Sequence, residues 1–285
     1  MNFAIDSQTL KDLNIFDEHE NSVFSMLKSA RTIGARDRLR EMMCKPSSDL
    51  QELLMRKEAI RFFFDRKISL NIKNEELDLI EFYLKSDKRK SKGNTIDALA
   101  DYFTRNSSND YYIIKTGLKY LLKMVNYLSD FITTHSSSET PKYLITLFNT
   151  IDNIINQGLL KDAKSMNEYE LGFVTINKLD QAFRGKEREN LHQLLRIVYE
   201  LDVFNALSEA AAKKGFCFPE YDESPDLAFS INGLFHPGIS NPVKNDLAFD
   251  MSQNIVFLTG SNMAGKSSLL KSLGLSIYLA HLGFP

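Results

Sequence analysis

Residues 259–268 read Thr-Gly-Ser-Asn-Met-Ala-Gly-Lys-Ser-Ser, and this stretch decides how the C-terminal part of the chain is expected to fold. Gly260, Gly265, Lys266 and Ser267 match the pattern G-x-x-x-x-G-K-[ST] of phosphate-binding loops. From average composition, a chance match in a chain of 285 residues has a probability on the order of 1%. The pattern therefore predicts a phosphate-binding loop.

The sequence on either side of the loop supports this prediction. Ile255-Val-Phe-Leu258 is a continuous apolar run, so residues 254–259 are predicted to form a strand buried on both faces. Residues 267–280 have the apolar spacing of a helix that packs along one side. A strand, a glycine-containing loop and a helix, in this order, place backbone N–H groups at a helix N-terminus where phosphate binds.

The expected ligand of the loop is ATP or ADP with Mg²⁺. Backbone N–H groups converge on the anionic phosphates, and the helix dipole favours negative charge there. Lys266 is expected to neutralise charge on the β- and γ-phosphates, and the Ser267 hydroxyl to be a ligand of Mg²⁺. The predicted nucleotide-binding residues are Gly260, Ser261, Asn262, Met263, Ala264, Gly265, Lys266, Ser267 and Ser268.

The proline content and the spacing of apolar residues differ between the first 218 residues and the rest of the chain. Two of the seven prolines lie in the first 218 residues and five in the last 67, so the first part can be mostly helical. Two apolar stripes have helical spacing: Leu118, Leu121, Leu122, Val125, Leu128 and Ile132, and then Leu191, Leu194, Leu195, Val198, Leu201 and Phe204. Short apolar runs after Pro219, such as residues 227–231, predict strands. We expect a helical domain over residues 1–220 and an α/β domain over residues 221–285.

Composition limits the class of protein. With 43% hydrophobic and 25% charged residues, the chain has the composition of a soluble globular protein. No stretch approaches the roughly 18 uninterrupted apolar residues that a membrane span needs. The acidic residue in the first six, Asp6, is unlike a signal peptide, so we expect a cytoplasmic protein without a membrane partner. Cys44 and Cys217 have no closely spaced partner, which predicts neither a disulfide framework nor a zinc site.

Charge does not decide whether nucleic acid is a partner. The net charge is −2, so a nucleic acid would have to bind a local basic patch. The basic run at residues 85–94 contains Lys85, Lys88, Arg89, Lys90 and Lys92, and we interpret it as a solvated loop. The five histidines are scattered, and none is assigned as a catalyst.

Residues within and around the loop resemble the MutS family. The distinctive loop core of that family is T-G-x-N-M-x-G-K-S, which residues 259–267 match, including the unusual Asn262-Met263 pair. The likeness continues at His236-Pro237 and at Asn245-Asp246. It extends to Tyr199-Glu-Leu-Asp-Val-Phe204, Ala210-Ala211 and Phe218-Pro219, and more weakly to Thr32-Ile-Gly34-Ala-Arg36, Leu39-Arg40, Pro46 and Arg56.

This resemblance implies a fold and a function. The fold would be mainly α, with the multi-helix core and lever domain of the family followed by the first strands and the P-loop helix of an α/β ATPase domain. The function would be that of a DNA-repair ATPase, a homodimer that binds DNA and whose helical levers couple the nucleotide state to DNA binding. Hydrolysis would depend on Lys266, Ser267 and residues beyond Pro285.

Four positions depart from the family pattern. Ser261 stands where the family usually has Pro, Ala264 where it usually has Gly, and Ser268 where it usually has Thr. None of these changes removes a phosphate-binding group. Val243 lies about where many relatives have an aromatic residue that stacks on the adenine, so Val243 is the candidate for the adenine side of the site.

Parts of the family architecture are missing from the sequence. We find no segment for the mismatch-reading domain or the clamp domain, so the chain is more similar to shorter MutS-like proteins than to the mismatch sensor. The chain also ends at Pro285, before an acidic Walker B strand. We therefore expect a truncated ATPase domain, no complete catalytic set and no appreciable ATP hydrolysis.

Two other interpretations remain open. One is a different P-loop ATPase or kinase with a helical N-terminal domain, against which the Asn262-Met263 pair and His236-Pro237 argue. The other is a helical scaffold whose P-loop has lost its function. A measurement of nucleotide binding separates the second interpretation from the first and from the MutS-like one.

Overall fold

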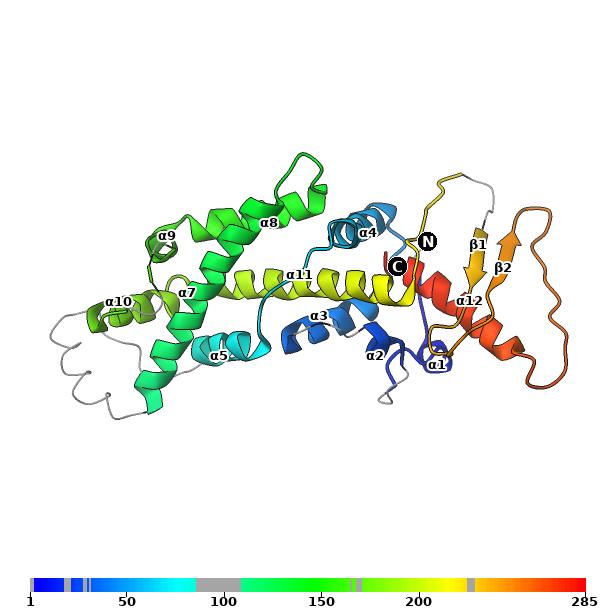
Figure 1. The fold of residues 1–285 in the computed structure, drawn as a ribbon, viewed down its shortest axis with the longest axis horizontal. Coiled ribbons are helices and arrows are strands. Elements are labelled where there is room, and N and C mark those ends of the chain that lie inside the picture. Colours follow the sequence, from blue (N-terminus) through cyan, green and yellow to red (C-terminus); the bar gives the residue numbers. More distant parts are fainter. Residues whose placement is uncertain are drawn as a thin grey trace. The chain divides into compact units, whose positions relative to one another are not determined.

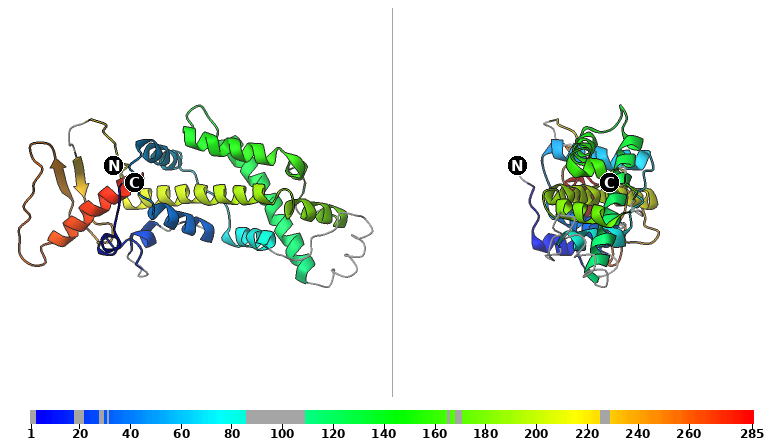
Figure 2. Two further views of the ribbon diagram at one scale, coloured as in Figure 1. Left: turned by 180° about the vertical axis from the view of Figure 1, so that it is seen from behind. Right: turned by 90° about the vertical axis from the view of Figure 1, so that its left-hand side faces the viewer.

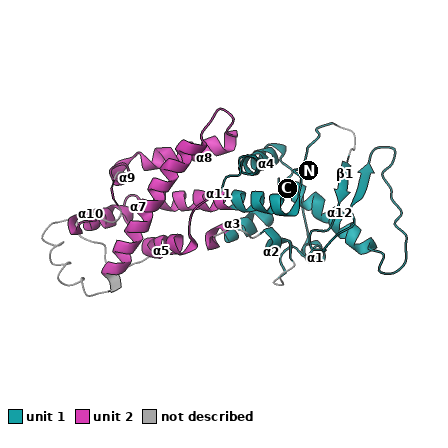
Figure 3. Cartoon of the chain, viewed as in Figure 1, with its two compact units in different colours: residues 1–30, 36–69, 203–285 teal, residues 31–35, 70–202 magenta. Residues whose placement is uncertain are grey.

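Most of the chain is helical (Figure 1). The computed structural model describes residues 3–17, 22–27, 30, 32–85, 109–164, 166–167, 171–224 and 229–285. By their contacts these residues form two compact units (Figure 3): unit 1 comprises Met1–Ala30, Arg36–Ser69 and Val203–Pro285, and unit 2 comprises Arg31–Ala35 and Leu70–Asp202. The domain boundary expected after residue 220 stays a prediction. None of the described helices is long and apolar enough to cross a membrane.

Both units are built mainly from helices. Unit 1 contains α1 (Ser7–Asp12), α2 (Val23–Leu27), most of α3 (Ile33–Met43), α4 (Leu50–Asp65), the end of α11 (Arg188–Lys214), β1 (Phe229–Leu234), β2 (Asn245–Phe249) and α12 (Lys266–Ala280). Unit 2 contains α5 (Asn74–Lys85), α7 (Asn109–His135), α8 (Lys142–Ile155), α9 (Gly158–Ala163), α10 (Phe173–Phe183) and the first part of α11.

The two apolar stripes seen in the sequence lie on the two longest of these helices. The first stripe, from Leu118 to Ile132, is buried along α7, which contacts α5, α8 and α10. The second, from Leu191 to Phe204, is buried along α11. Both helix predictions are confirmed, because apolar side chains three and four residues apart share one face of a helix.

A buried ion pair holds helices of unit 2 together. Asp180 on α10 accepts hydrogen bonds from Arg184 Nε at 2.6 Å, from Arg184 Nη2 at 2.5 Å, and from the Tyr83 hydroxyl of α5 at 3.0 Å. Burial raises the pKa of Tyr83, so its phenol stays protonated and donates. Gly117 on α7 leaves room for this ring, since a Cβ at residue 117 would lie 2.5 Å from Tyr83 Cβ and Cγ. Tyr83 therefore joins α5, α7 and α10.

The start of α3 is capped from a distant helix within unit 2. Asp202 on α11 is buried and accepts hydrogen bonds from Thr32 N–H at 3.0 Å and from Thr32 Oγ1 at 2.9 Å. Thr32 Oγ1 also accepts the N–H of Ala35 at 3.2 Å. The first N–H groups of a helix have no partner inside it, so these bonds stabilise the N-terminus of α3.

Aromatic packing forms the core of unit 1 between α4 and the end of α11. The rings of Phe63 and Phe204, both fully buried, meet edge to face with centroids 6.2 Å apart. Phe64, on the neighbouring face of α4, packs in the same way on Phe218 at 5.5 Å. Such edge contacts between aromatic rings add to the free energy of burying them.

The sheet of unit 1 is a two-stranded antiparallel hairpin. β1 pairs with β2 in the register Phe229 with Phe249 and Ile231 with Leu247, and an irregularity follows toward Leu234. Figure 1 and the left-hand view of Figure 2 show α12 beside this hairpin, and contacts join α12 to β1. The strand expected at residues 227–231 is present from Phe229 onward, whereas residues 227 and 228 lie outside the described part.

The strand expected at residues 254–259 is not formed, and that prediction is wrong for this structure. The segment has an irregular backbone, and its apolar side chains are exposed to solvent: Ile255 is 75% exposed and Phe257 is 89% exposed. A strand needs a partner for its backbone N–H and C=O groups. Among the described residues, the hairpin strands pair with each other and no segment pairs with residues 254–259.

Candidate nucleotide-binding site

Helix α12 begins directly after a glycine in a left-handed conformation. Gly265 is the N-cap residue, with φ +87° and ψ 7°. Residues with a Cβ rarely adopt this conformation, so the backbone itself requires glycine here. Met263, two residues earlier, also has a positive φ of 68° and an exposed side chain. These two residues turn the chain into α12.

The ammonium group of Lys266 is held over the loop. Lys266 Nζ donates to the carbonyl of Gly260 at 2.7 Å and to the carbonyl of Ser261 at 2.6 Å. The side chain therefore folds back from the first turn of α12 across the loop that precedes it. This places the positive charge on the same side as the N-terminus of the helix.

The first turn of α12 also presents backbone donors. In the described part of the chain, the N–H groups of Lys266, Ser267 and Ser268 have no hydrogen-bond acceptor, whereas Leu269 N–H donates to Gly265 C=O at 2.9 Å. These three are among the N–H groups that every α-helix leaves unpaired, and they carry the positive end of the helix dipole. With the Lys266 ammonium they form a donor set that suits phosphate oxygens.

Among the described residues, the loop offers fewer groups to Mg²⁺ than to phosphate. Ser267 is exposed at the start of α12, so its hydroxyl can reach a bound metal. The described residues contain no cluster of three or more His, Cys, Asp or Glu side chains that could hold an ion. Because Mg²⁺ keeps several waters and binds phosphate oxygens readily, Ser267 would hold it only together with the nucleotide phosphates.

The other sequence-predicted residues lie within this loop, in the first turn of α12, or just before β2. Ser261, Asn262 and Ala264 are exposed and Ser268 is half-buried. The candidate adenine-side residue Val243 is 82% exposed and lies just before β2, where its carbonyl accepts a hydrogen bond from Asn245 Nδ2 at 3.1 Å. Its role toward an adenine stays a prediction.

His236 lies at the turn that follows β1. Its Nδ1 accepts a hydrogen bond from Gly238 N–H at 3.2 Å, and its carbonyl accepts one from Ile239 N–H at 3.1 Å. Burial lowers the pKa of His236, and the positive charge of Lys271 on α12 lowers it further. The His236-Pro237 turn is therefore electrostatically connected to the helix that begins at the loop.

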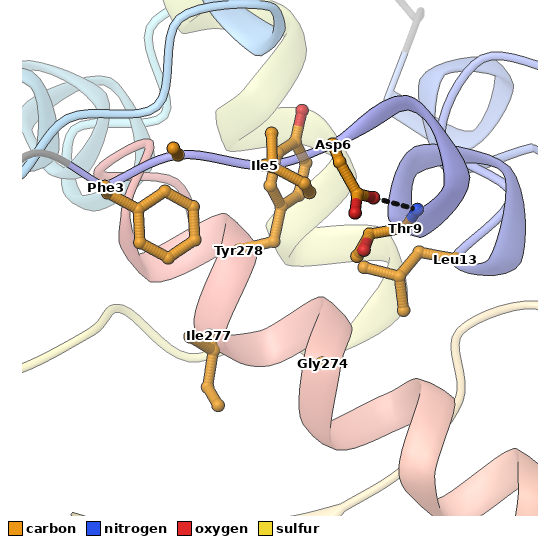
Figure 4. Close-up of a pocket in the computed structure, with 9 residues that line it drawn as sticks. Phe3, Ile5, Asp6, Thr9, Leu13, Gly274, Ile277 and Tyr278 are labelled. Atoms are coloured by element: carbon orange, nitrogen blue, oxygen red, sulfur yellow. Dashed lines mark hydrogen bonds between the residues drawn. The ribbon is translucent and has the colours of Figure 1, made fainter.

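A cavity of about 480 Å³ opens beside the other half of α12 (Figure 4). Its lining is mostly apolar and includes Phe3, Ile5, Leu13, Ile277 and Tyr278. Gly274, the first residue of α12 at this cavity, is eight residues beyond Lys266, which corresponds to about 12 Å along a helix. The cavity is thus separate from the loop. No pattern in the sequence indicated it, because the N-terminal segment and α12 are far apart in the chain.

The basic run that begins at Lys85 lies outside the described residues except for Lys85 itself. Lys85 Nζ forms an ion pair with Glu81 at 2.6 Å on the exposed side of α5. The interpretation of residues 86–94 as a solvated loop stays a prediction.

The sequence is similar to a known protein family and to several of its members. A family model described as MutS domain III matches residues 8–208. The chain is 32% identical over 127 residues to Endonuclease MutS2 of Thermus thermophilus, covering 39% of this chain and 16% of that protein. It is 32% identical over 122 residues to DNA mismatch repair protein MutS of Fusobacterium nucleatum, covering 41% and 13%, respectively. It is 39% identical over 101 residues to the protein of that name from Thermus thermophilus, covering 34% and 12%. The matched segments thus span a small part of these relatives.

Proposed function

The chain belongs to the MutS family, and we propose that it is an ATP-binding DNA-repair protein in which a nucleotide at residues 260–268 is coupled to DNA binding. The family match covers the helical part of the chain, and the proposed nucleotide site lies after it. Two of the similar proteins are described as DNA mismatch repair proteins, which supports mismatch repair or a related DNA-processing pathway.

The observation that carries the nucleotide proposal is the donor set at the start of α12. Three unpaired N–H groups, the left-handed Gly265 and the Lys266 ammonium all lie within the first helical turn and the loop before it. Backbone N–H groups would bind phosphate oxygens, and Lys266 would exchange its two carbonyl acceptors for phosphate oxygens of higher charge. The expected ligand remains ATP or ADP with Mg²⁺.

Each of these residues would have a different role in binding the nucleotide. Gly265 lets the backbone turn so that the N–H groups of residues 266–268 point the same way, and Lys266 neutralises charge on the phosphates. The Ser267 hydroxyl would be a ligand of Mg²⁺, which offsets charge between the β- and γ-phosphates when it is bound. Hydrolysis also needs an oriented water and further charge stabilisation, so the loop by itself supports binding rather than turnover.

DNA and a second copy of the chain are the proposed partners. Coupling requires that the nucleotide state change the affinity for DNA, and by linkage DNA then changes the affinity for nucleotide by the same factor. Membership in the MutS family argues against an unrelated P-loop kinase. A helical scaffold whose loop has lost its function remains the rival, and it predicts that no nucleotide binds.

Fluorescence anisotropy of a labelled ADP with Mg²⁺ tests the proposal. Wild type should bind, and Lys266→Ala should weaken binding at least tenfold, since a charge-assisted contact contributes about 1.5–3 kcal/mol. The matched control is Lys271→Ala, which removes an exposed lysine from the same helix and should leave the affinity within about twofold. Equal affinities of wild type and Lys266→Ala would contradict the assignment.

A further inference from the structure

The C-terminal end of α12 is bonded to three separate segments of unit 1. Its terminal carbonyls are the acceptors: Ala280 C=O receives the Tyr221 hydroxyl at 2.6 Å, and Leu282 C=O receives Arg56 Nη1 at 2.7 Å. His281 C=O receives the N–H of Ser47, between α3 and α4, at 2.7 Å. Ala280 C=O also receives the N–H of Gly283 at 3.0 Å, so the carbonyls at the end of α12 and just after it are bonded both locally and by other segments of unit 1.

Arg56 binds two partners with the two arms of its guanidinium. Nη1 donates to Leu282 C=O, and Nη2 forms an ion pair with Glu52 at 2.7 Å, one turn earlier on α4. The Arg56 side chain is 13% exposed, so this arrangement is largely shielded from water. Gly283 has φ +70° and passes so close to α4 that a Cβ would lie 2.7 Å from Leu53 C=O. The residues that follow α12 therefore pack closely against α4.

Two tyrosine hydroxyls complete the attachment. Tyr278, fully buried on α12, donates to the carbonyl of Met43 at the end of α3. Burial raises the pKa of Tyr278, and it raises the pKa of Tyr221 to about 12. Both phenols therefore stay protonated near neutral pH and act as donors throughout the physiological range.

The two ends of α12 differ in their surroundings. At its N-terminus, the loop and Ser267 are exposed, whereas Leu275, Tyr278 and the residues after His281 are buried. A helix of 15 residues is about 22 Å long and is stiff over that length. Because packed helices move as rigid elements, a displacement of the loop end would be carried toward the bonds at the other end.

We infer that Arg56 and Tyr221 are positioning residues for the C-terminal end of α12, and that through them the ligand state of the loop is transmitted along α12 to the corner between α3 and α4. This inference rests on the proposed function, because it requires a ligand at residues 260–268. It assigns a role to residues that touch neither the loop nor a nucleotide. Ser47 N–H reports this connection directly, since its acceptor is the His281 carbonyl.

Hydrogen–deuterium exchange with Mg·ADP as the probe tests the inference. In wild type, saturating Mg·ADP should slow exchange in residues 260–268 and also change exchange in residues 43–56. Arg56→Gln removes the guanidinium group that contacts both Leu282 C=O and Glu52. Tyr221→Phe removes only the hydroxyl and keeps the ring. In both variants the response of residues 260–268 should persist, and the response of residues 43–56 should fall by at least half.

Two further variants separate positioning from general destabilisation. Arg61→Gln removes an arginine one turn farther along α4, where it is 57% exposed and pairs with Asp65, so it should respond as wild type. Arg56→Lys should restore part of the response, because an ammonium can reach one of the two partners of Arg56 but lacks the fork. Tyr221→Phe keeps the test valid if Arg56→Gln does not fold.

The outcomes distinguish this inference from the proposed function. A protected loop with no change at residues 43–56 in wild type overturns the inference alone, as does an undiminished response in both Arg56→Gln and Tyr221→Phe. No binding of Mg·ADP to wild type by calorimetry overturns the proposed function, and the inference with it. A response that is lost in the two variants and kept in Arg61→Gln supports it.

Discussion

The ring of Tyr199 lies directly over Gly34. A Cβ at residue 34 would overlap the ring atoms Cε2 and Cζ and would lie 2.7 Å from Cδ2. The hydroxyl of Tyr199 donates to Glu81, which also pairs with Lys85, so the ring is held in place at its far end. In unit 2 the first turn of α3 can approach α11 this closely only because residue 34 has no side chain.

Gly34→Ala should therefore destabilise the protein. Alanine gains about 1 kcal/mol of helix propensity over glycine, but an added methyl in a filled space costs about 1–3 kcal/mol. We expect a net loss of about 1–2 kcal/mol in the free energy of unfolding, measured by urea denaturation. In a Tyr199→Ala background the same change should become neutral or stabilising. An equal cost in both backgrounds would show that the ring is not the cause.

Spacing in the sequence was enough to predict the helices with one apolar face. The stripes on α7 and α11 are local patterns, and burial of one face decides the structure in both cases. The helix expected at residues 267–280 is present as α12, and Gly265 before it has the backbone conformation that needs glycine, whereas phosphate binding at this loop stays a prediction.

Contacts between distant residues could not be predicted in this way. Tyr83 and Asp180 are 97 positions apart, and neither belongs to a motif. The apolar run at residues 255–258 predicted a strand, but a strand exists only where a partner pairs with it, and the run itself says nothing about a partner. β2 escaped prediction because its sequence, Asn-Asp-Leu-Ala-Phe, begins with polar residues and resembles a turn.

Asp180→Asn should be strongly destabilising. Asparagine keeps an acceptor for the Tyr83 hydroxyl but leaves the buried Arg184 charge without its counterion. Breaking one partner of a buried pair costs about 3–5 kcal/mol. The double variant Asp180→Asn with Arg184→Met should recover much of this loss. Chemical denaturation of the three proteins measures it, and a double variant that is less stable than Asp180→Asn would refute the explanation.

His236 should show a depressed pKa that depends on Lys271. Because the folded pKa lies below the ordinary value of 6.5, the unfolded chain binds more protons as pH falls. The stabilising contribution of neutral His236 is therefore complete above about pH 6.5 and is lost at lower pH. Lys271→Ala should raise the pKa of His236, though not to its ordinary value, since burial remains the larger cause. An NMR titration of the His236 ring that is unchanged in Lys271→Ala would contradict this.

DNA binding by this chain should be weak, steeply dependent on salt and indifferent to a mismatch. Contacts to DNA phosphates are expected to supply most of this binding, and they carry no sequence information. We expect the affinity for a duplex to fall sharply between about 50 and 200 mM salt. Gel-shift titrations with matched and mismatched duplexes measure both properties. A clear preference for the mismatched duplex would reveal a reading element that the sequence did not show.

Backbone amide NMR of a deuterated sample tests nucleotide binding at the start of α12, because it observes the N–H groups there one by one. On titration with Mg·ADP, the amide resonances of Gly265, Lys266, Ser267 and Ser268 should shift most, with saturation at one nucleotide per chain. Lys266→Ala should need a much higher concentration for the same shifts. Shifts confined to the cavity residues Phe3, Leu13 and Tyr278, or no shifts at all, would contradict nucleotide binding at residues 260–268.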